Sequence, residues 1–348
     1  MSDDRYAEVA PWLRRRLFDG LVIPAHPLAL LDDGSFDEER QRGLTRYYHD
    51  AGAGGIAVGV HTTQFNIREP QHNLLETVLR IAAEEISMLD RRTGLQTVLI
   101  AGVVGQTSQA VREAKLAASL GYHAGLLSLS ALPDASDDEL IDHCRAVARE
   151  IPLFGFYLQR AVGGRKLSKE FWKRFSTIPN VVGIKIAPFN RYETIDVVRA
   201  VVESGRENEV ALYTGNDDHI VLDLITTYEV ITERGTVYIG MAGGLLGQWA
   251  VWTRRAVDIL DVCKKVRETG IIPSELITLG EQLTEANAAV FDVANDFAGC
   301  IPGINEVLRR EGRLASNRCL DEHETLSPEQ DVLLSRVMKA CPEVVDPS

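Results

Sequence analysis

Eight short apolar runs, separated by longer amphipathic stretches, constrain the fold of this chain more than any other feature. They occupy residues 20–30, 54–60, 96–105, 124–130, 153–159, 181–187, 209–215 and 236–243. Each run is nearly continuously apolar, which is typical of parallel strands that are covered on both faces. We therefore expect eight strands joined by helical crossovers.

The stretches between these runs carry helix signals. Residues 35–52 begin with a serine suited to an N-cap and end at a glycine, and residues 109–121 end at Gly121. Residues 134–151 begin with acidic and end with basic side chains, which suits the helix dipole. Eight β–α units in succession predict a (β/α)8 TIM barrel. A doubly wound parallel sheet is the alternative, but the first strand is not followed by the glycine-rich turn typical of that fold.

From residue 250 onward the strand-like runs stop and the pattern becomes helical. Four such stretches follow, at residues 250–268, 275–295, 303–312 and 327–340. We expect three parts: an N-terminal segment (1–18), the barrel (19–250) and a C-terminal helical region (251–348) that packs on the barrel.

The charge and the cysteine content narrow the class of protein. The chain has 348 residues and a formal net charge of -13, which argues against a nucleic-acid or membrane partner. Its N-terminus has no apolar signal-peptide core, and no apolar window reaches the roughly 18 residues that a membrane span needs. The five cysteines are scattered without a C-x-x-C pair, and no metal-ligand motif is present. We expect free thiols and a cytoplasmic protein.

Lys185 is the most informative single residue, because it interrupts the sixth apolar run, VVGIKIA. Burial of an unpaired ammonium group is costly, and burial lowers the pKa of an amine and makes it nucleophilic near neutral pH. A neutral lysine that attacks a carbonyl forms a Schiff base, whose cationic nitrogen accepts electrons. The alternative is a lysine at the strand end whose stem is buried and whose head lies in water.

The sequence around this lysine resembles the pyruvate-dependent class I aldolases of the dihydrodipicolinate synthase and N-acetylneuraminate lyase family. Residues 181–190, VVGIKIAPFN, match the family's lysine strand, and GFYLQRAVGG (155–164) stands at its fifth strand, with Tyr157 at the family's interval before Lys185. GVHTTQF (59–65) resembles the loop after strand two. YTGNDD (213–218) resembles the seventh strand, and CIPGINEVLRREGRL (300–314) the C-terminal helices. These matches cover nearly the whole chain in the family's order.

The resemblance implies a lyase that works through a lysine imine. Lys185 would be the Schiff-base nucleophile and Tyr157 the general acid/base, while Thr62 and Thr63 would hold the carboxylate of a 2-keto acid. No metal or organic cofactor is expected, because the protonated imine does the electrophilic work. Family members associate as dimers or tetramers, so we expect a homo-oligomer. The residues alone leave alternatives open: Tyr157 as a core aromatic, and the threonines as a turn cap.

The chain departs from the family's pattern at several positions. Gln64 and Phe65 replace a Gly-Glu pair, and residues 158–160 replace Asn-x-Pro. Val162 stands where dihydrodipicolinate synthases have an arginine for the distal carboxylate of the aldehyde, and the P-Y-Y segment after strand four is absent. The proton relay of that enzyme is therefore incomplete, and we do not expect dihydrodipicolinate synthesis.

Other polar residues fall at the carboxyl ends of predicted strands, where barrel active sites are built. His61 titrates near neutral pH and could move protons, and Arg68 could pair with the carboxylate of the substrate or with a neighbouring acid. We also expect Gly215 and Val237 to line the substrate. Further candidates are His26, Gln64, Asn66, Arg160 and Arg165. His26 lies between prolines and is also explained by fixing that turn.

Two motifs have competing interpretations. GNDD (215–218) carries two acids, but adjacent residues of a strand point opposite ways, so a loop is expected there rather than a metal site. MAGGLLGQ (241–248) lacks the Lys-Ser/Thr of a nucleotide loop, so a barrel loop is expected there.

We therefore expect a Schiff-base-forming aldolase or hydro-lyase that acts on pyruvate or another 2-keto acid. Two alternatives stay open: a sugar-acid dehydratase that uses the same imine, and a keto-acid-binding protein on the same scaffold that has lost catalysis.

Overall fold

The computed structural model describes residues 5–346, which form two compact units. The first unit comprises residues 5–21, 98–216 and 223–244, and the second comprises residues 22–97, 217–222 and 245–346. The strands are β1 (Val22–Pro24), β2 (Gly55–Val58), β3 (Val98–Val103), β4 (Ala124–Leu127), β5 (Leu153–Leu158), β6 (Val181–Ala187), β7 (Ala211–Thr214), β8 (Thr227–Thr232), β9 (Gly235–Gly240) and β10 (Gly243–Leu246).

Eight of these strands form one sheet, in the order β1-β10-β7-β6-β5-β4-β3-β2. The pairs of the first unit, from β3 to β7 and on to β10, are parallel. The strands follow one another in chain order, without the reversal of a doubly wound sheet. The predicted (β/α)8 TIM-barrel class is therefore confirmed.

Helices separate most of the strands and make up the end of the chain. They are α1 (Pro11–Phe18), α2 (Glu38–Asp50), α3 (Leu75–Thr93), α4 (Thr107–Ser119), α5 (Asp137–Ala148), α6 (Lys169–Ser176), α7 (Arg191–Glu203), α8 (Ile220–Ile225), α9 (Thr253–Thr269), α10 (Ser274–Val290), α11 (Cys300–Arg310) and α12 (Gln330–Ala340). The four helical stretches expected at the end of the chain thus correspond to α9–α12. The predicted boundaries of the three parts stay a prediction.

The helix starts follow from local capping. Ser136 caps α5 and forms a capping box with Glu139. The start of α2 was predicted at Ser35, but Asp37 is its cap, because the Asp37 carboxylate accepts the N–H of Arg40.

The core of the first unit lies between its strands and helices. Val182, Ile184 and Ile186 of β6 are fully buried, which contributes about 1.5–3 kcal/mol each. Gly155 of β5 has no side chain because a Cβ there would lie 2.7 Å from the Phe175 ring of α6. β5 and α6 therefore pack closely.

The second unit pairs α2 with α3 through buried charge. Glu85 of α3 is 4% exposed and accepts hydrogen bonds from Arg42 and Arg46 of α2. In the same unit, the Tyr48 hydroxyl of α2 donates to the carbonyl of Ala250. These contacts fix α2 from two sides.

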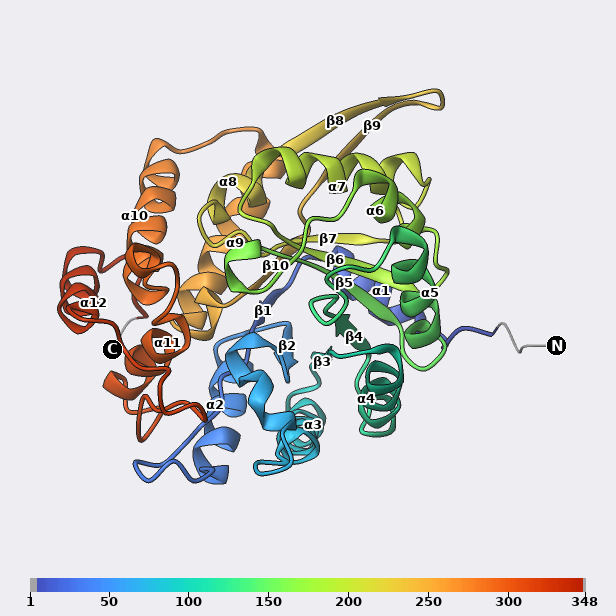
Figure 1. The fold of residues 1–348 in the computed structure, drawn as a ribbon. Coiled ribbons are helices and arrows are strands. Elements are labelled where there is room, and N and C mark those ends of the chain that lie inside the picture. The colour runs from blue at the N-terminus through green and yellow to red at the C-terminus, as the bar shows by residue number, and fades with distance from the viewer. Residues whose placement is uncertain (1–4, 347–348) are drawn as a thin grey trace. The chain divides into compact units, whose positions relative to one another are not determined.

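The eighth strand of the sheet is not the one predicted. Residues 236–243 were expected to form it, but β9 pairs with β8 as an antiparallel hairpin outside the eight-stranded sheet, and β10 takes the place in the sheet. β8 packs against α7, and Figure 1 shows the hairpin running beside that helix. The apolar content of β9 suggested a barrel strand, although one face of the hairpin is solvent-exposed, with Ile231 at 80% and Tyr238 at 67%.

Two further expectations concern the chain as a whole. All five cysteines are free thiols, as predicted. Between residues 5 and 346 we find no helix with both the length and the apolar character that crossing a bilayer requires.

Candidate active site

Lys185 stands in the middle of β6 and is only partly exposed. Its Nζ atom lies over the ring of Phe156 in β5, 4.6 Å from the ring centre. Its stem passes Gly215, where a Cβ would lie 2.7 Å from Cε and 3.0 Å from Cγ of the lysine. The structure thus brings together two of the candidate residues, Lys185 and Gly215, and adds Phe156.

A buried polar cluster holds the loop that carries Gly215. The fully buried carboxylate of Asp223 accepts hydrogen bonds from Thr214 (2.6 Å) and Asn216 (3.0 Å) and pairs with Arg191. The backbone N–H of Gly215 donates to the carbonyl of Ile186, at 2.7 Å. The residues on both sides of Gly215 are therefore fixed, which holds the glycine against the lysine stem.

Tyr157 faces away from Lys185. At the start of the two strands Leu153 pairs with Val181, and continuation of that register would place Tyr157 opposite Lys185. A register shift after Leu153 places Phe156 there instead. Because successive side chains of a strand point to opposite faces, a one-residue shift exchanges the faces of all that follow.

The Tyr157 side chain is accordingly packed against the helix layer. Its ring lies 5.4 Å from that of Trp172 in α6, and its hydroxyl is 3.3 Å from both the N and the O of Leu167. Burial raises the pKa of Tyr157 above its usual value, and the nearby Glu193 carboxylate adds to the effect.

Thr62 and Thr63 lie in the second unit, in the single-turn helix η1 (His61–Thr63) that follows β2. The Thr62 hydroxyl donates to the carbonyl of Ala25 at 2.8 Å, and the Thr63 hydroxyl to that of His26 at 2.6 Å. A hydroxyl has one proton to donate. Both hydroxyl protons are therefore engaged in this structure, and the backbone N–H of Thr63 donates to the carbonyl of Val60 at 3.0 Å.

His61 and Arg68 meet on one aromatic ring. The His61 ring is 6.0 Å and the Arg68 guanidinium 5.7 Å from the centre of the Phe65 ring, in the turn η2 (Phe65–Arg68). Arg68 also donates to the carbonyl of Gly59 at 3.0 Å. Arg68 thus helps to hold the loop after β2, and both residues lie on the same short segment as the threonines.

Gln64 explains one departure from the family's pattern. It has a positive φ of 67°, a conformation that favours the glycine found at this position in the family. Its side-chain oxygen accepts the N–H of Leu320 at 2.6 Å, which ties it to the C-terminal part of the same unit. The glutamine thus adopts the turn that the glycine would make and adds an anchor.

His26 has a structural role. Its Nε2 lies 2.9 Å from the Thr45 hydroxyl and its Nδ1 2.8 Å from the Pro27 carbonyl. Burial lowers the pKa of His26 to about 4, which keeps the ring neutral at physiological pH. The interpretation that His26 fixes a turn is therefore the better one.

The remaining candidates are held by other contacts. Arg160 pairs with Glu193 at 3.2 Å, and Arg165 donates to the carbonyl of Ala135 at 2.8 Å. Val237 lies in β9, opposite Val230. Val237 therefore lies outside the eight-stranded sheet, and its contact with substrate stays a prediction.

The GNDD motif supports the fold. Asp217 accepts the N–H of Gln248 through its carboxylate, and its carbonyl accepts from the Asn287 amide. Within the described part of the chain, no three histidine, cysteine or carboxylate side chains are grouped so that they could hold a metal ion.

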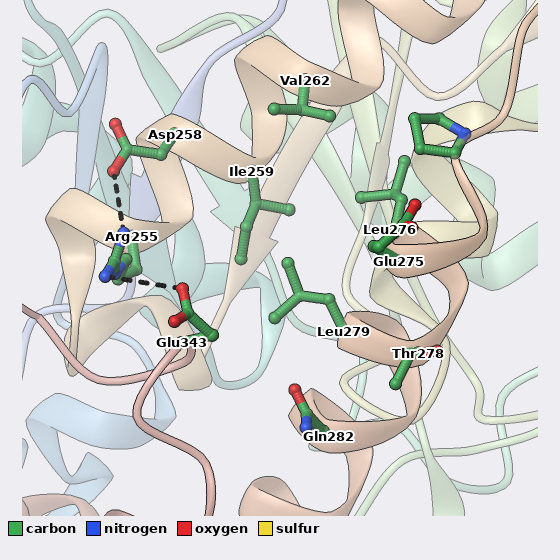
Figure 2. Close-up of a pocket in the computed structure, with 11 residues that line it drawn as sticks. Arg255, Asp258, Ile259, Val262, Glu275, Leu276, Thr278, Leu279, Gln282 and Glu343 are labelled. Carbon is green, nitrogen blue, oxygen red and sulfur yellow. Dashed lines mark ion pairs between the residues drawn. The ribbon is translucent and has the colours of Figure 1, made fainter.

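A separate groove of about 520 Å³ lies between α9 and α10 of the second unit. Figure 2 shows Ile259 of α9 and Leu279 of α10 facing it, with Arg255 at one end paired with Asp258 and Glu343. None of the candidate residues from the sequence lines it.

Phe156 is the functional candidate that the sequence did not reveal. It is one apolar residue among several in β5, and only the register of β5 against β6 places it opposite Lys185. Phe156 directly precedes Tyr157 in the sequence, so the right part of β5 was identified. The sequence pattern does not show the register shift that places Phe156 rather than Tyr157 opposite Lys185.

Comparison with known proteins gives consistent results. The model of the dihydrodipicolinate synthetase family matches residues 19–227, which ends where β8 begins. A 4-hydroxy-tetrahydrodipicolinate synthase from Thiobacillus denitrificans is 28% identical over 202 residues, which cover 57% of this chain and 62% of that protein. A probable 5-dehydro-4-deoxyglucarate dehydratase from Acinetobacter baumannii is 32% identical over 106 residues, 30% of this chain and 33% of that protein.

Solved structures support the fold. YagE from Escherichia coli K12, a prophage protein of the dihydrodipicolinic acid synthase family solved in complex with pyruvate, superposes with a TM-score of 0.75. The superposition covers 93% of this chain and 98% of that one, at 16% identity. The chain spans less than two thirds of the length of the two synthases that match it over 202 and 211 residues, so the likeness establishes fold and family rather than a substrate.

Proposed function

Because the chain belongs to the dihydrodipicolinate synthetase family, we propose that it is a lyase that forms a Schiff base between Lys185 and a 2-keto acid. The observation that carries the proposal is the position of Lys185, whose amine lies over an aromatic ring and whose stem is held against Gly215. A surface lysine that extends into water has no such restraint.

The proposed chemistry uses the lysine nitrogen as nucleophile and then as electron sink. The neutral amine adds to the keto carbon, water leaves, and the cationic imine acidifies the hydrogens on the adjacent carbon. Loss of such a proton gives an enamine, which can add to an aldehyde. In the reverse direction, cleavage of that carbon–carbon bond releases the aldehyde and leaves the enamine. The protonated imine supplies the electrophilic chemistry, so the proposal includes no metal or organic cofactor.

We propose that the segment after β2 binds the carboxylate of the keto acid. The hydroxyls of Thr62 and Thr63 turn toward the carboxylate from the carbonyls of Ala25 and His26, and Arg68 and His61 on the same segment supply positive charge and a titratable ring. Gly215 gives the substrate close access to the amine. A homo-oligomer, as in relatives of this family, is part of the proposal.

The proposed proton carrier is Tyr157, which is supported by its interval before Lys185. Its hydroxyl contacts Leu167 in this structure, so the proposal requires the Tyr157 side chain to turn toward the imine when substrate binds. Replacement by phenylalanine should leave the imine intact and slow proton exchange on the adjacent carbon by about 100-fold, as expected for loss of a general acid/base. Tyr48→Phe is the matched control, since Tyr48 in α2 is also buried and its hydroxyl donates to the carbonyl of Ala250. Deuterium exchange into pyruvate measures both variants. Unchanged exchange in Tyr157→Phe would assign Tyr157 to the core.

Reductive trapping tests the imine itself. Incubation with pyruvate and other 2-keto acids, followed by borohydride, should add a stable mass that peptide mapping places on Lys185. Lys185→Met should abolish the adduct, whereas Lys169→Met, an exposed lysine paired with Glu203, should retain it. Absence of an adduct with every keto acid, or an adduct on another lysine, would contradict the proposal.

A second candidate is a sugar-acid dehydratase that uses the same imine. The probable 5-dehydro-4-deoxyglucarate dehydratase is 32% identical to this chain over 106 residues, which favours this second candidate. Product analysis separates the two, because a dehydratase releases water and an aldolase breaks a carbon–carbon bond. An adduct without exchange or turnover would indicate a keto-acid-binding protein.

A further inference from the structure

Phe156 lies under the nitrogen that the proposed reaction uses. The 4.6 Å between Lys185 Nζ and the ring centre is within the roughly 6 Å over which an aromatic face attracts a cation. The attraction depends on the positive charge of the nitrogen, so it is much weaker for a neutral amine.

The geometry of this contact is held from both sides. Phe156 is 5% exposed and is the register partner of Lys185 across β5 and β6. Gly215 leaves just enough room for the lysine stem, since any Cβ there would approach it within 3 Å. On its other side Lys185 pairs in register with Tyr213 of β7, whose hydroxyl donates to the carbonyl of Leu17.

We propose that Phe156 sets the charge state of Lys185, by favouring the cationic forms of its nitrogen over the neutral amine. The two cations are the resting ammonium and the iminium formed with the keto acid. This inference rests on the proposed function and adds to it a residue that tunes the nucleophile.

The reaction step makes the consequence explicit. The neutral amine forms a bond to the keto carbon, and the carbonyl oxygen leaves as water with one amine proton and one proton from solvent. The nitrogen keeps its other proton and carries the positive charge. A ring that favours both cations makes the neutral nucleophile scarcer at low pH and makes the iminium harder to hydrolyse at high pH.

Phe156→Leu should therefore change adduct formation in opposite directions. Below the midpoint of the wild-type pH profile, borohydride trapping with pyruvate should become about 3- to 10-fold faster. Above that midpoint, the pyruvate concentration that gives half-maximal adduct should rise about 3- to 10-fold. Structural damage would instead slow trapping below the midpoint and raise the half-maximal concentration above it, so it would weaken adduct formation on both sides of the midpoint.

Phe154→Leu is the matched control. Phe154 is fully buried on the same face of the same strand, and its ring contacts Tyr213 at 5.4 Å. Its replacement should lower stability without moving the pH midpoint. Phe156→Met, which is unbranched, adapts to the cavity and lacks the aromatic face, should behave like Phe156→Leu and replaces it where the leucine variant does not fold.

The outcomes separate this inference from the proposed function. One outcome is that the wild-type protein forms the adduct and that Phe156→Leu, Phe156→Met and Phe154→Leu all keep its pH midpoint and half-maximal pyruvate concentration. This outcome would overturn the role of Phe156 and leave the proposed function standing. Absence of any adduct in the wild-type protein would overturn the proposed function instead.

Discussion

Glycine at position 215 leaves the space that the lysine stem occupies. An alanine Cβ there would lie 2.7 Å from Lys185 Cε and 2.8 Å from Ala187 Cβ, so the amine must shift. A displacement of a reacting group by about 1 Å can cost a factor of 100. We expect Gly215→Ala to slow adduct formation by about 10- to 100-fold, measured by borohydride trapping.

The control for this variant is Gly43→Ala. Gly43 lies in α2, and a Cβ added there would have no neighbouring atom within 4 Å, so an alanine meets open space. This variant should trap keto acid at the wild-type rate. Equal rates in all three proteins would show that the contact with Gly215 does not position the amine.

Residues differ in how clearly the sequence indicates their roles. Lys185 stands out because a charge interrupts an apolar run, and its place in β6 is as predicted. Phe156 does not stand out, because an aromatic residue in an apolar strand carries no distinguishing sign. The register shift that brings it to Lys185 depends on how β5 and β6 pair, which spacing along the chain does not encode.

At the scale of elements, α2 and α3 offer a direct comparison of buried and exposed charge. The Glu85 side chain is 6% exposed and pairs with Arg42 and Arg46, whereas the neighbouring Glu84 side chain is 48% exposed and pairs with Arg42 and Arg80. The buried Glu85 carboxylate accepts charge-assisted hydrogen bonds from both arginines, and its loss removes them together. We expect Glu85→Ala to lower the free energy of unfolding by about 2 kcal/mol and Glu84→Ala by less than about 1 kcal/mol.

Urea denaturation measures both variants. Similar losses of unfolding free energy in the two variants would mean that the ion pairs of Glu85 are as accessible to water as those of Glu84.

The helices themselves were predictable, since capping residues and amphipathic periodicity are local.

The β8–β9 hairpin shows where element prediction fails. Residues 236–243 carry enough apolar residues for a barrel strand, and local composition cannot say which strand they pair with. The preceding strand held a better clue, because the charged Glu229 stands between Tyr228 and Val230. Alternation of this kind marks a strand with one face in water rather than one covered on both faces.

At the scale of the molecule, each unit holds a histidine that is neutral in the fold. Burial lowers the pKa of His26 in the second unit and of His143 in the first to about 4, from 6.5. The unfolded chain therefore binds these protons more readily than the folded one. The stability they contribute is complete above pH 6.5 and is lost as the pH falls toward 4, by about 3 kcal/mol for each at most.

We expect His26→Gln to lose less stability than the wild-type protein between about pH 7 and about pH 4.5, measured by urea denaturation at each pH. His323→Gln, at an exposed position, should keep the wild-type dependence. An unchanged slope in His26→Gln would mean that the buried ring does not govern acid unfolding.

The hairpin also bears on how this chain can vary. It is inserted between β7 and β10 without adding a strand to the sheet, so its length can change while the order of the barrel strands stays the same. Because a longer loop costs little additional closure free energy, insertions and deletions at this point should change the stability of the fold only slightly. We expect the segment to differ in length among the nearest relatives and to serve as a marker of descent.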